Sequence, residues 1–267
     1  MKYFTKTAYV KKDGDHMNII SICDHKGGVG KTTTAAAIAQ GIAIKKKNHV
    51  LLIDCDPQGT ATTSVYNVTS VHHSIYDVIK GHATASEAII KTEAGDIIAY
   101  DKQLANLDIE YRSDLEAYHL LQKALESLEG YTHIIIDTAP GVATLATLQA
   151  LTASDGVLIP ILCSPDNFDN LKLTYDSISK VQKYTNPDLH ILGVFFTLHG
   201  GRSNIMKQYE ELYQDTCKAY KMPLLKTTVR RSVTVQEAHA LGVSLFDYAP
   251  RATVTADYQS LIKELKL

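Results

Sequence analysis

Glycines and lysines gather near the start of the chain in the segment DHKGGVGKTTT, residues 24–34. Its glycines are Gly27, Gly28 and Gly30. Without a Cβ, a glycine adopts positive φ and lets the backbone approach a ligand closely. Successive N–H groups at the start of a helix attract anions, and the Lys31 ammonium adds a full positive charge. The Thr32 hydroxyl is placed to ligate Mg²⁺, and the Thr33 hydroxyl supplies another donor. The segment therefore has the composition of a phosphate-binding loop.

The segment departs from the usual phosphate-loop pattern at two positions. That pattern places a glycine five residues before Gly30, where this chain has His25. It has no need of a second lysine, whereas this chain carries Lys26 at the start of Lys-Gly-Gly-Val-Gly-Lys-Thr. The segment is therefore not a standard match to that pattern.

Carboxylates follow two of the apolar runs. Asp54 and Asp56 follow the apolar residues of the segment HVLLIDCDPQGTATT, and Asp137 follows those of the segment THIIIDTAPGVA. Ligands of open α/β sheets collect at the carboxyl ends of the strands. A buried carboxylate there is costly unless it meets a cation or hydrogen-bond donors. Asp54 and Asp56 therefore either meet a cation or cap the backbone of the loop that follows them.

Continuous apolar, β-branched runs alternate with segments that have helical spacing. The runs are typical of parallel strands covered on both faces. Expected strands span residues 19–23, 50–54, 134–137, 157–162 and 191–197. Expected helices span residues 32–45, 115–128, 145–153, 171–184 and 204–220. The alternation predicts an α/β fold, a doubly wound, mostly parallel sheet with helices on both faces.

Length and composition suit a single compact domain. The chain has 267 residues, of which 45% are hydrophobic and 21% charged. Residues 17–267 are expected to form that domain, preceded by a flexible leader over residues 1–16. No run approaches the roughly 18 to 20 apolar residues of a membrane span, so a cytoplasmic location is expected. The cysteines are scattered, without a visible disulfide framework or zinc ligand set.

Together these motifs resemble the ParA/Soj family of the ParA/MinD superfamily, whose phosphate loop is called a deviant Walker A motif. The resemblance implies ATP and Mg²⁺ as cofactors and a homodimer that forms on ATP binding. Lys26 would then act across the dimer interface, beside Lys31 and the water-orienting Asp56 as catalytic residues. Metal contacts would come from Thr32, Asp54 and Asp137. Nucleotide contacts would come from Lys26, Gly27, Gly28, Val29, Gly30, Lys31, Thr32, Thr33 and Arg231.

The same resemblance implies binding of non-specific DNA in the ATP state. The family's DNA patch consists of arginines in its C-terminal third, and the residues expected to bind DNA here are Arg202, Arg230 and Arg231. Arg202 falls on one of the family's arginines, whereas Arg230 is an extra arginine where the family usually has proline. Arg231 also falls on an arginine near the adenine pocket, so its role is open between nucleotide and DNA contact. Thr234 stands where another family arginine is expected. A ParB-like DNA-binding protein would stimulate hydrolysis, and the ATP-bound protein would associate with the nucleoid during plasmid or chromosome partitioning.

Other functions remain open at this point. The formal net charge of −2 excludes a uniformly basic nucleic-acid binder, so the arginines could be ordinary solvated surface charge. One alternative is a MinD-like positioning ATPase, although residues 256–267 resemble a closing helix more than a basic membrane-surface helix. Another is a metabolic ATP-dependent ligase of the same superfamily, such as a dethiobiotin-synthetase-like enzyme.

Overall fold

A seven-stranded sheet forms the centre of the molecule, in the order β3-β4-β2-β5-β1-β6-β7. The computed structural model describes residues 17–45, 47–141, 143–200 and 204–267. Every neighbouring pair of strands is parallel except β3 and β4, which are antiparallel. The strands are β1 (Asn18–Ile22), β2 (Val50–Cys55), β3 (Ile89–Thr92), β4 (Gly95–Ile98), β5 (His133–Thr138), β6 (Gly156–Leu162) and β7 (His190–Thr197).

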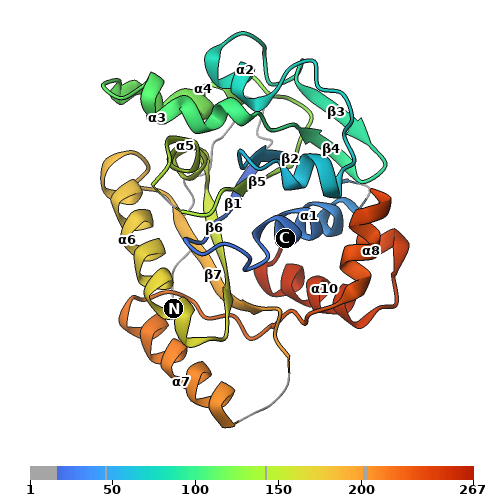
Figure 1. Ribbon diagram of the computed structural model, residues 1–267, viewed down its shortest axis with the longest axis vertical. Coiled ribbons are helices and arrows are strands. Elements are labelled where there is room, and N and C mark those ends of the chain that lie inside the picture. The colour runs from blue at the N-terminus through green and yellow to red at the C-terminus, as the bar shows by residue number, and fades with distance from the viewer. Residues whose placement is uncertain (1–16, 46, 142, 201–203) are drawn as a thin grey trace.

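Helices cover both faces of this sheet, as Figure 1 shows. Over the described residues they are α1 (Lys31–Ala43), α2 (Ile75–Lys80), α3 (Leu107–Glu110), α4 (Leu120–Leu125), α5 (Leu145–Ala153), α6 (Phe168–Tyr184), α7 (Asn204–Ala219), α8 (Val233–Leu241), α9 (Leu245–Tyr248) and α10 (Thr253–Leu265). Adjacent strand residues point to opposite faces, so Ile20 and Ile22 join the core under α1 while Ile19 joins the other core. The predicted α/β class, with a mostly parallel sheet covered on both faces, is confirmed.

One face of the sheet is covered by α1, α8, α9 and α10. Helix α1 is rich in alanine, and Gly41 near its end lets α9 and α10 approach closely. A Cβ at Gly41 would collide with the Cδ1 atom of Ile262 and would lie 2.7 Å from Cζ of Phe246. Both side chains are buried. The close approach of these helices therefore depends on the missing Cβ.

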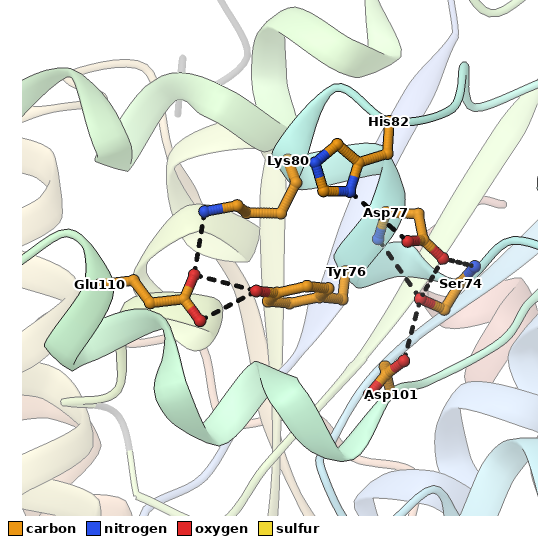
Figure 2. Close-up of polar contacts among 7 residues, drawn as sticks. All are labelled: Ser74, Tyr76, Asp77, Lys80, His82, Asp101 and Glu110. Atoms are coloured by element: carbon orange, nitrogen blue, oxygen red, sulfur yellow. Dashed lines mark hydrogen bonds and ion pairs between the residues drawn. The ribbon is translucent and has the colours of Figure 1, made fainter.

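Helices α2, α4, α5, α6 and α7 pack on the opposite face, in two clusters of buried side chains. Figure 2 shows the polar contacts that fix α2 there. Ser74 and Asp77 form a reciprocal capping box at the start of α2. The Tyr76 hydroxyl donates to Glu110 of α3 at 2.9 Å, and the Lys80 ammonium pairs with the same carboxylate at 3.0 Å. These contacts join α2 to α3.

The five predicted strands are confirmed, but the β3–β4 hairpin was not predicted because its strands are short and only partly buried. The predicted helix over residues 115–128 differs in detail. A 3₁₀ turn, Leu115–His119, comes first, and the α-helix α4 occupies Leu120–Leu125. Asp114 caps the turn by accepting from the Glu116 N–H at 2.9 Å. The expected leader over residues 1–16 lies outside the described residues.

None of the helices in the part of the chain that the structure describes has the length and apolar character needed to cross a bilayer.

Replacing Gly41 with alanine should destabilise the protein although alanine favours helices. Overpacking against the Phe246 ring and Ile262 costs about 1–3 kcal/mol, which exceeds the gain in helix propensity of at most about 1 kcal/mol. Urea unfolding of the wild type and Gly41→Ala measures the difference. Because Ile262→Val removes the Cδ1 atom, Gly41→Ala should cost less in that background. Equal costs in both backgrounds would contradict the packing argument.

Candidate functional site

The glycine-rich loop connects β1 to α1 and has the backbone geometry that its glycines predict. Gly28 and Gly30 have φ values of 73° and 87°, in the left-handed region that favours glycine. Gly30 is the N-cap of α1, and its carbonyl accepts from the Thr34 N–H at 2.9 Å. The Thr197 hydroxyl at the end of β7 donates to the carbonyl of the buried Val29 at 2.6 Å. The sheet therefore holds this loop in place.

The two lysines of the loop have different environments. The Lys31 side chain is buried, and its ammonium donates to the Lys26 carbonyl at 2.9 Å. Burial lowers the pKa of Lys31, whereas the nearby Asp24 carboxylate acts in the opposite direction. The Lys26 side chain is partly exposed and makes no hydrogen bond or ion pair with the described residues. Of the two lysines, only Lys31 thus forms a side-chain hydrogen bond within this loop.

Asp24 lies buried beside Lys31 at the start of the loop. Its Oδ1 accepts from the Thr174 hydroxyl of α6 at 2.9 Å, and the same hydroxyl accepts from the His25 N–H at 3.0 Å. Its Oδ2 has no hydrogen-bond partner among the described residues. Burial raises the pKa of Asp24 to about 6, although the Thr174 hydrogen bond and Lys31 lower it. Thr174 thereby ties the loop to α6.

Asp54 is satisfied by backbone and hydroxyl donors from its own loop. Its Oδ2 accepts from the Thr62 N–H at 2.8 Å and from the Thr62 hydroxyl at 2.7 Å. Its Oδ1 accepts from the Asp56 N–H at 3.2 Å. Burial raises the pKa of Asp54 to about 6, and the Thr62 hydrogen bonds oppose that shift. In this structure Asp54 has the capping role that was the alternative to metal binding.

Asp137 has the opposite character, although it pairs with Asp54 in the register of β2 and β5. Asp137 is fully buried, and neither carboxylate oxygen has a hydrogen-bond partner in the described chain. Burial raises the pKa of Asp137 well above its usual value, and the charge of Asp54 raises it further. The Thr32 hydroxyl, which is near Asp137 without meeting the geometry of a hydrogen bond, and Lys31 lower it only in part. Such a carboxylate fits a divalent cation, held with the Thr32 hydroxyl.

Asp56 and the loop after β5 complete the site. One Asp56 oxygen accepts from the Gln58 N–H at 2.9 Å, and the other makes no hydrogen bond with the described residues. The Gly141 N–H donates to the His25 carbonyl at 3.0 Å, so the loop after β5 contacts the glycine-rich loop directly. A Cβ at Gly27 would lie 3.7 Å from the Pro140 ring. The sequence indicated neither these contacts nor the Thr174 and Thr197 anchors, because their partners are distant in the chain.

The arginines predicted to bind DNA differ in how they are held. The Arg230 guanidinium donates to both oxygens of Asp257, at 2.6 and 2.9 Å. Arg231 is exposed and makes no ion pair with the described residues. Arg202 lies outside the described residues. Arg231 is therefore freer than Arg230 to meet a phosphate.

A phosphate loop between β1 and α1, with acidic residues where β2 and β5 end, defines the P-loop NTPase class. A family model described as an AAA domain matches residues 17–191. The chain is 36% identical to the sporulation initiation inhibitor protein Soj of Bacillus subtilis, over 92% of this chain and 97% of that protein. It is 31% identical to the chromosome partitioning protein ParA of Caulobacter vibrioides, over 93% and 94% of the two chains.

A solved structure shares the fold as well. Cobyrinic acid a,c-diamide synthase from Mycobacterium smegmatis, with bound ATP analog and magnesium, superimposes with a TM-score of 0.78 at 26% identity. The match covers 92% of this chain and 93% of that one. The chain belongs to the ParA/Soj family of P-loop ATPases.

Asp137→Asn should stabilise the nucleotide-free protein. Because folding raises the pKa of Asp137, the folded state keeps a proton that the unfolded chain releases, and wild-type stability falls as pH rises above the unfolded value. The asparagine removes this cost, with an expected gain on the order of 1–3 kcal/mol at pH 8. Urea unfolding from pH 5 to pH 8 should show the gain growing with pH.

The exposed Asp188→Asn serves as the control and should leave the pH dependence unchanged. A loss of stability in Asp137→Asn at every pH would mean that the carboxylate already has a stabilising partner in the nucleotide-free protein.

Proposed function

We propose that this protein is a partitioning ATPase that dimerises when it binds ATP and Mg²⁺, holds non-specific DNA as the dimer, and releases it after hydrolysis. A ParB-like DNA-binding partner would stimulate the hydrolysis. The observation that carries this proposal is the pair of lysines in one loop. Lys31 is bound within its own subunit, whereas the Lys26 side chain has no partner among the described residues. An unpaired lysine beside a phosphate loop is suited to the nucleotide of a second subunit.

The nucleotide contacts follow from the loop geometry. Backbone N–H groups from Gly27 to Thr33 and the ammonium of Lys31 would bind the phosphates. The hydroxyl of Thr32 and the unpartnered carboxylate of Asp137 would hold Mg²⁺, with Asp54 shaping the loop beside them. ATP bound here would supply the γ-phosphoryl group, and its hydrolysis would lead to release of the DNA.

Asp56 is the residue best placed to orient the attacking water. Its backbone N–H is held by Asp54 and one of its oxygens by the Gln58 N–H, so the position of the carboxylate is fixed. The remaining oxygen is available to accept a hydrogen bond from water. The nearby loop with Pro140 and Gly141 contacts His25 and would respond to the terminal phosphate.

DNA binding would rest on Arg231 and on Arg202, with Arg230 restrained by Asp257. Contacts from arginine to phosphate carry no sequence information, which suits non-specific binding. Arg231 could contact nucleotide instead, as the resemblance allows. The ATP-bound dimer would then be nucleoid-associated in the cytoplasm, without a membrane partner.

A metabolic synthase remains the main rival, because cobyrinic acid a,c-diamide synthase shares the fold and 26% of its residues. Identity is higher with the Soj and ParA proteins, at 36% and 31%. ATP turnover measured with and without DNA distinguishes the two functions, since a small-molecule synthase should show no DNA-dependent turnover. A MinD-like ATPase would instead pellet with liposomes when ATP is present.

Lys26 and Lys31 should give different defects when each is replaced by alanine. Lys31→Ala removes a buried charge from the phosphate site and should weaken ATP binding by about 10- to 100-fold. Lys26→Ala should keep ATP affinity within about threefold but lose DNA- and partner-stimulated turnover. Nucleotide titration and steady-state ATPase assays measure both. Stimulated turnover that survives Lys26→Ala would refute the role in trans.

Arg231→Ala should weaken ATP-dependent DNA binding. It should also make the slope of log K against log salt concentration shallower by about one, because one phosphate contact is lost. Arg230→Ala should change affinity less, because Asp257 already binds that guanidinium. Fluorescence anisotropy with unrelated duplexes of equal length, at several salt concentrations, measures both. Wild-type protein that binds ATP but retains no DNA at low salt would refute the partitioning function.

A further inference from the structure

We propose that Cys163, His199 and Glu210 form a zinc-binding site, separate from the nucleotide site, with a fourth position open to water. The three residues come from different elements. Cys163 directly follows β6, His199 lies just beyond β7, and Glu210 is on α7. One ligand atom from each lies within 4.8 Å of the other two.

The imidazole of His199 lies beside Glu210 in this cluster. Its Nε2 lies 3.3 Å from Oε1 of Glu210, and its side chain is 18% exposed. Its Nδ1 is buried without a hydrogen-bond partner among the described residues. Backbone pairing fixes the residue, because the His199 N–H donates to the Val229 carbonyl at 3.0 Å. The Nε2 atom faces the Glu210 carboxylate and is therefore the nitrogen that would bind the metal ion, while Nδ1 would carry the proton of the neutral imidazole.

Cys163 completes the set with a thiol that only weakly engages the protein. Its Sγ lies 3.6 Å from the Met206 carbonyl, the distance of a weak S–H donor. The other cysteines, Cys23, Cys55 and Cys217, are all buried elsewhere. When the metal binds, the thiol proton leaves to solvent and the thiolate sulfur bonds to the ion.

The chemistry of the donors selects zinc. Thiolate sulfur, imidazole nitrogen and carboxylate oxygen together suit Zn²⁺, whereas Mg²⁺ and Ca²⁺ prefer oxygen alone. Tetrahedral bond lengths place neighbouring zinc ligands about 3.5 Å apart. The cluster therefore needs to contract by about an ångström, which side-chain rotations can supply. Partial exposure of Cys163 and Glu210 leaves a path for the ion and room for a water ligand.

A metal here would link three parts of the fold. It would fasten α7 to the ends of β6 and β7, at the same edge of the sheet as the phosphate loop. Thr197, two residues before His199, donates to the Val29 carbonyl of that loop. The site is thus connected to the nucleotide loop through β7.

Cobalt substitution tests the site in the full chain. Purified, reduced protein is titrated with Co²⁺, and we expect one equivalent to give a thiolate-to-cobalt charge-transfer band together with intense tetrahedral d–d absorption. Zn²⁺ should abolish both by displacement. Cobalt at the Mg²⁺ site of the phosphate loop would give neither signal, because its ligands there are oxygens. A wild-type protein without the charge-transfer band would overturn the proposal.

Variants assign the ligands. Cys163→Ser should lose the charge-transfer band, and His199→Asn and Glu210→Gln should each weaken cobalt binding at least tenfold. His190→Asn and Glu211→Gln are matched controls, because both side chains are exposed and lie outside the cluster. A band that persists in Cys163→Ser, or that weakens equally in the controls, would refute the assignment.

A second measurement needs no variant. In wild-type protein, Zn²⁺ should slow alkylation of Cys163 by iodoacetamide at least tenfold, as read by mass spectrometry of the labelled peptide. Mg²⁺ at the same concentration should have no such effect. Equal protection by both ions, or none by Zn²⁺, would contradict a thiolate–zinc bond.

Discussion

Buried charge at the carboxyl ends of β1, β2 and β5 is the constraint around which this molecule is organised. Asp54 and Asp137 lie near the ends of the adjacent strands β2 and β5, Lys31 begins α1 after the loop that follows β1, and all three are nearly or fully removed from solvent. Isolated charges in such a place would be very costly, so each must be paired, hydrogen-bonded or neutralised. The protein satisfies Lys31 through the Lys26 carbonyl and Asp54 through Thr62. Asp137 has no hydrogen-bond partner among the described residues, and a bound metal ion would relieve that cost.

The sequence predicts the frame of this site well. Apolar runs ending in aspartate located β2 and β5, and the glycine-rich segment located the turn into α1, because parallel strands bury both faces and a phosphate loop needs positive φ. The sequence could not separate the roles of Asp54 and Asp137. Each ends an apolar strand, and only the fold reveals that Thr62 reaches Asp54 while no described donor satisfies Asp137.

Contacts between distant segments account for what sequence patterns missed. Thr174 and Thr197 look like ordinary helix and strand residues, yet their hydroxyls hold the phosphate loop from α6 and β7. The scattered cysteines likewise gave no sign of a side-chain cluster, because Cys163 meets His199 and Glu210 only in the folded chain. The β3–β4 hairpin was missed for a local reason, since short and partly buried strands lack a continuous apolar run.

These contacts also make the phosphate loop a junction between elements. Its His25 carbonyl accepts from Gly141 of the loop after β5, its His25 N–H donates to Thr174 of α6, and its Val29 carbonyl accepts from β7. A change in how the loop is held would therefore reach three elements through single hydrogen bonds, without rearrangement of the core. Packed cores resist small deformations, so such bonds are where a difference between nucleotide states can be expressed. If this loop binds phosphate as proposed, these hydrogen bonds would transmit the state of that phosphate to α6 and to the end of β7.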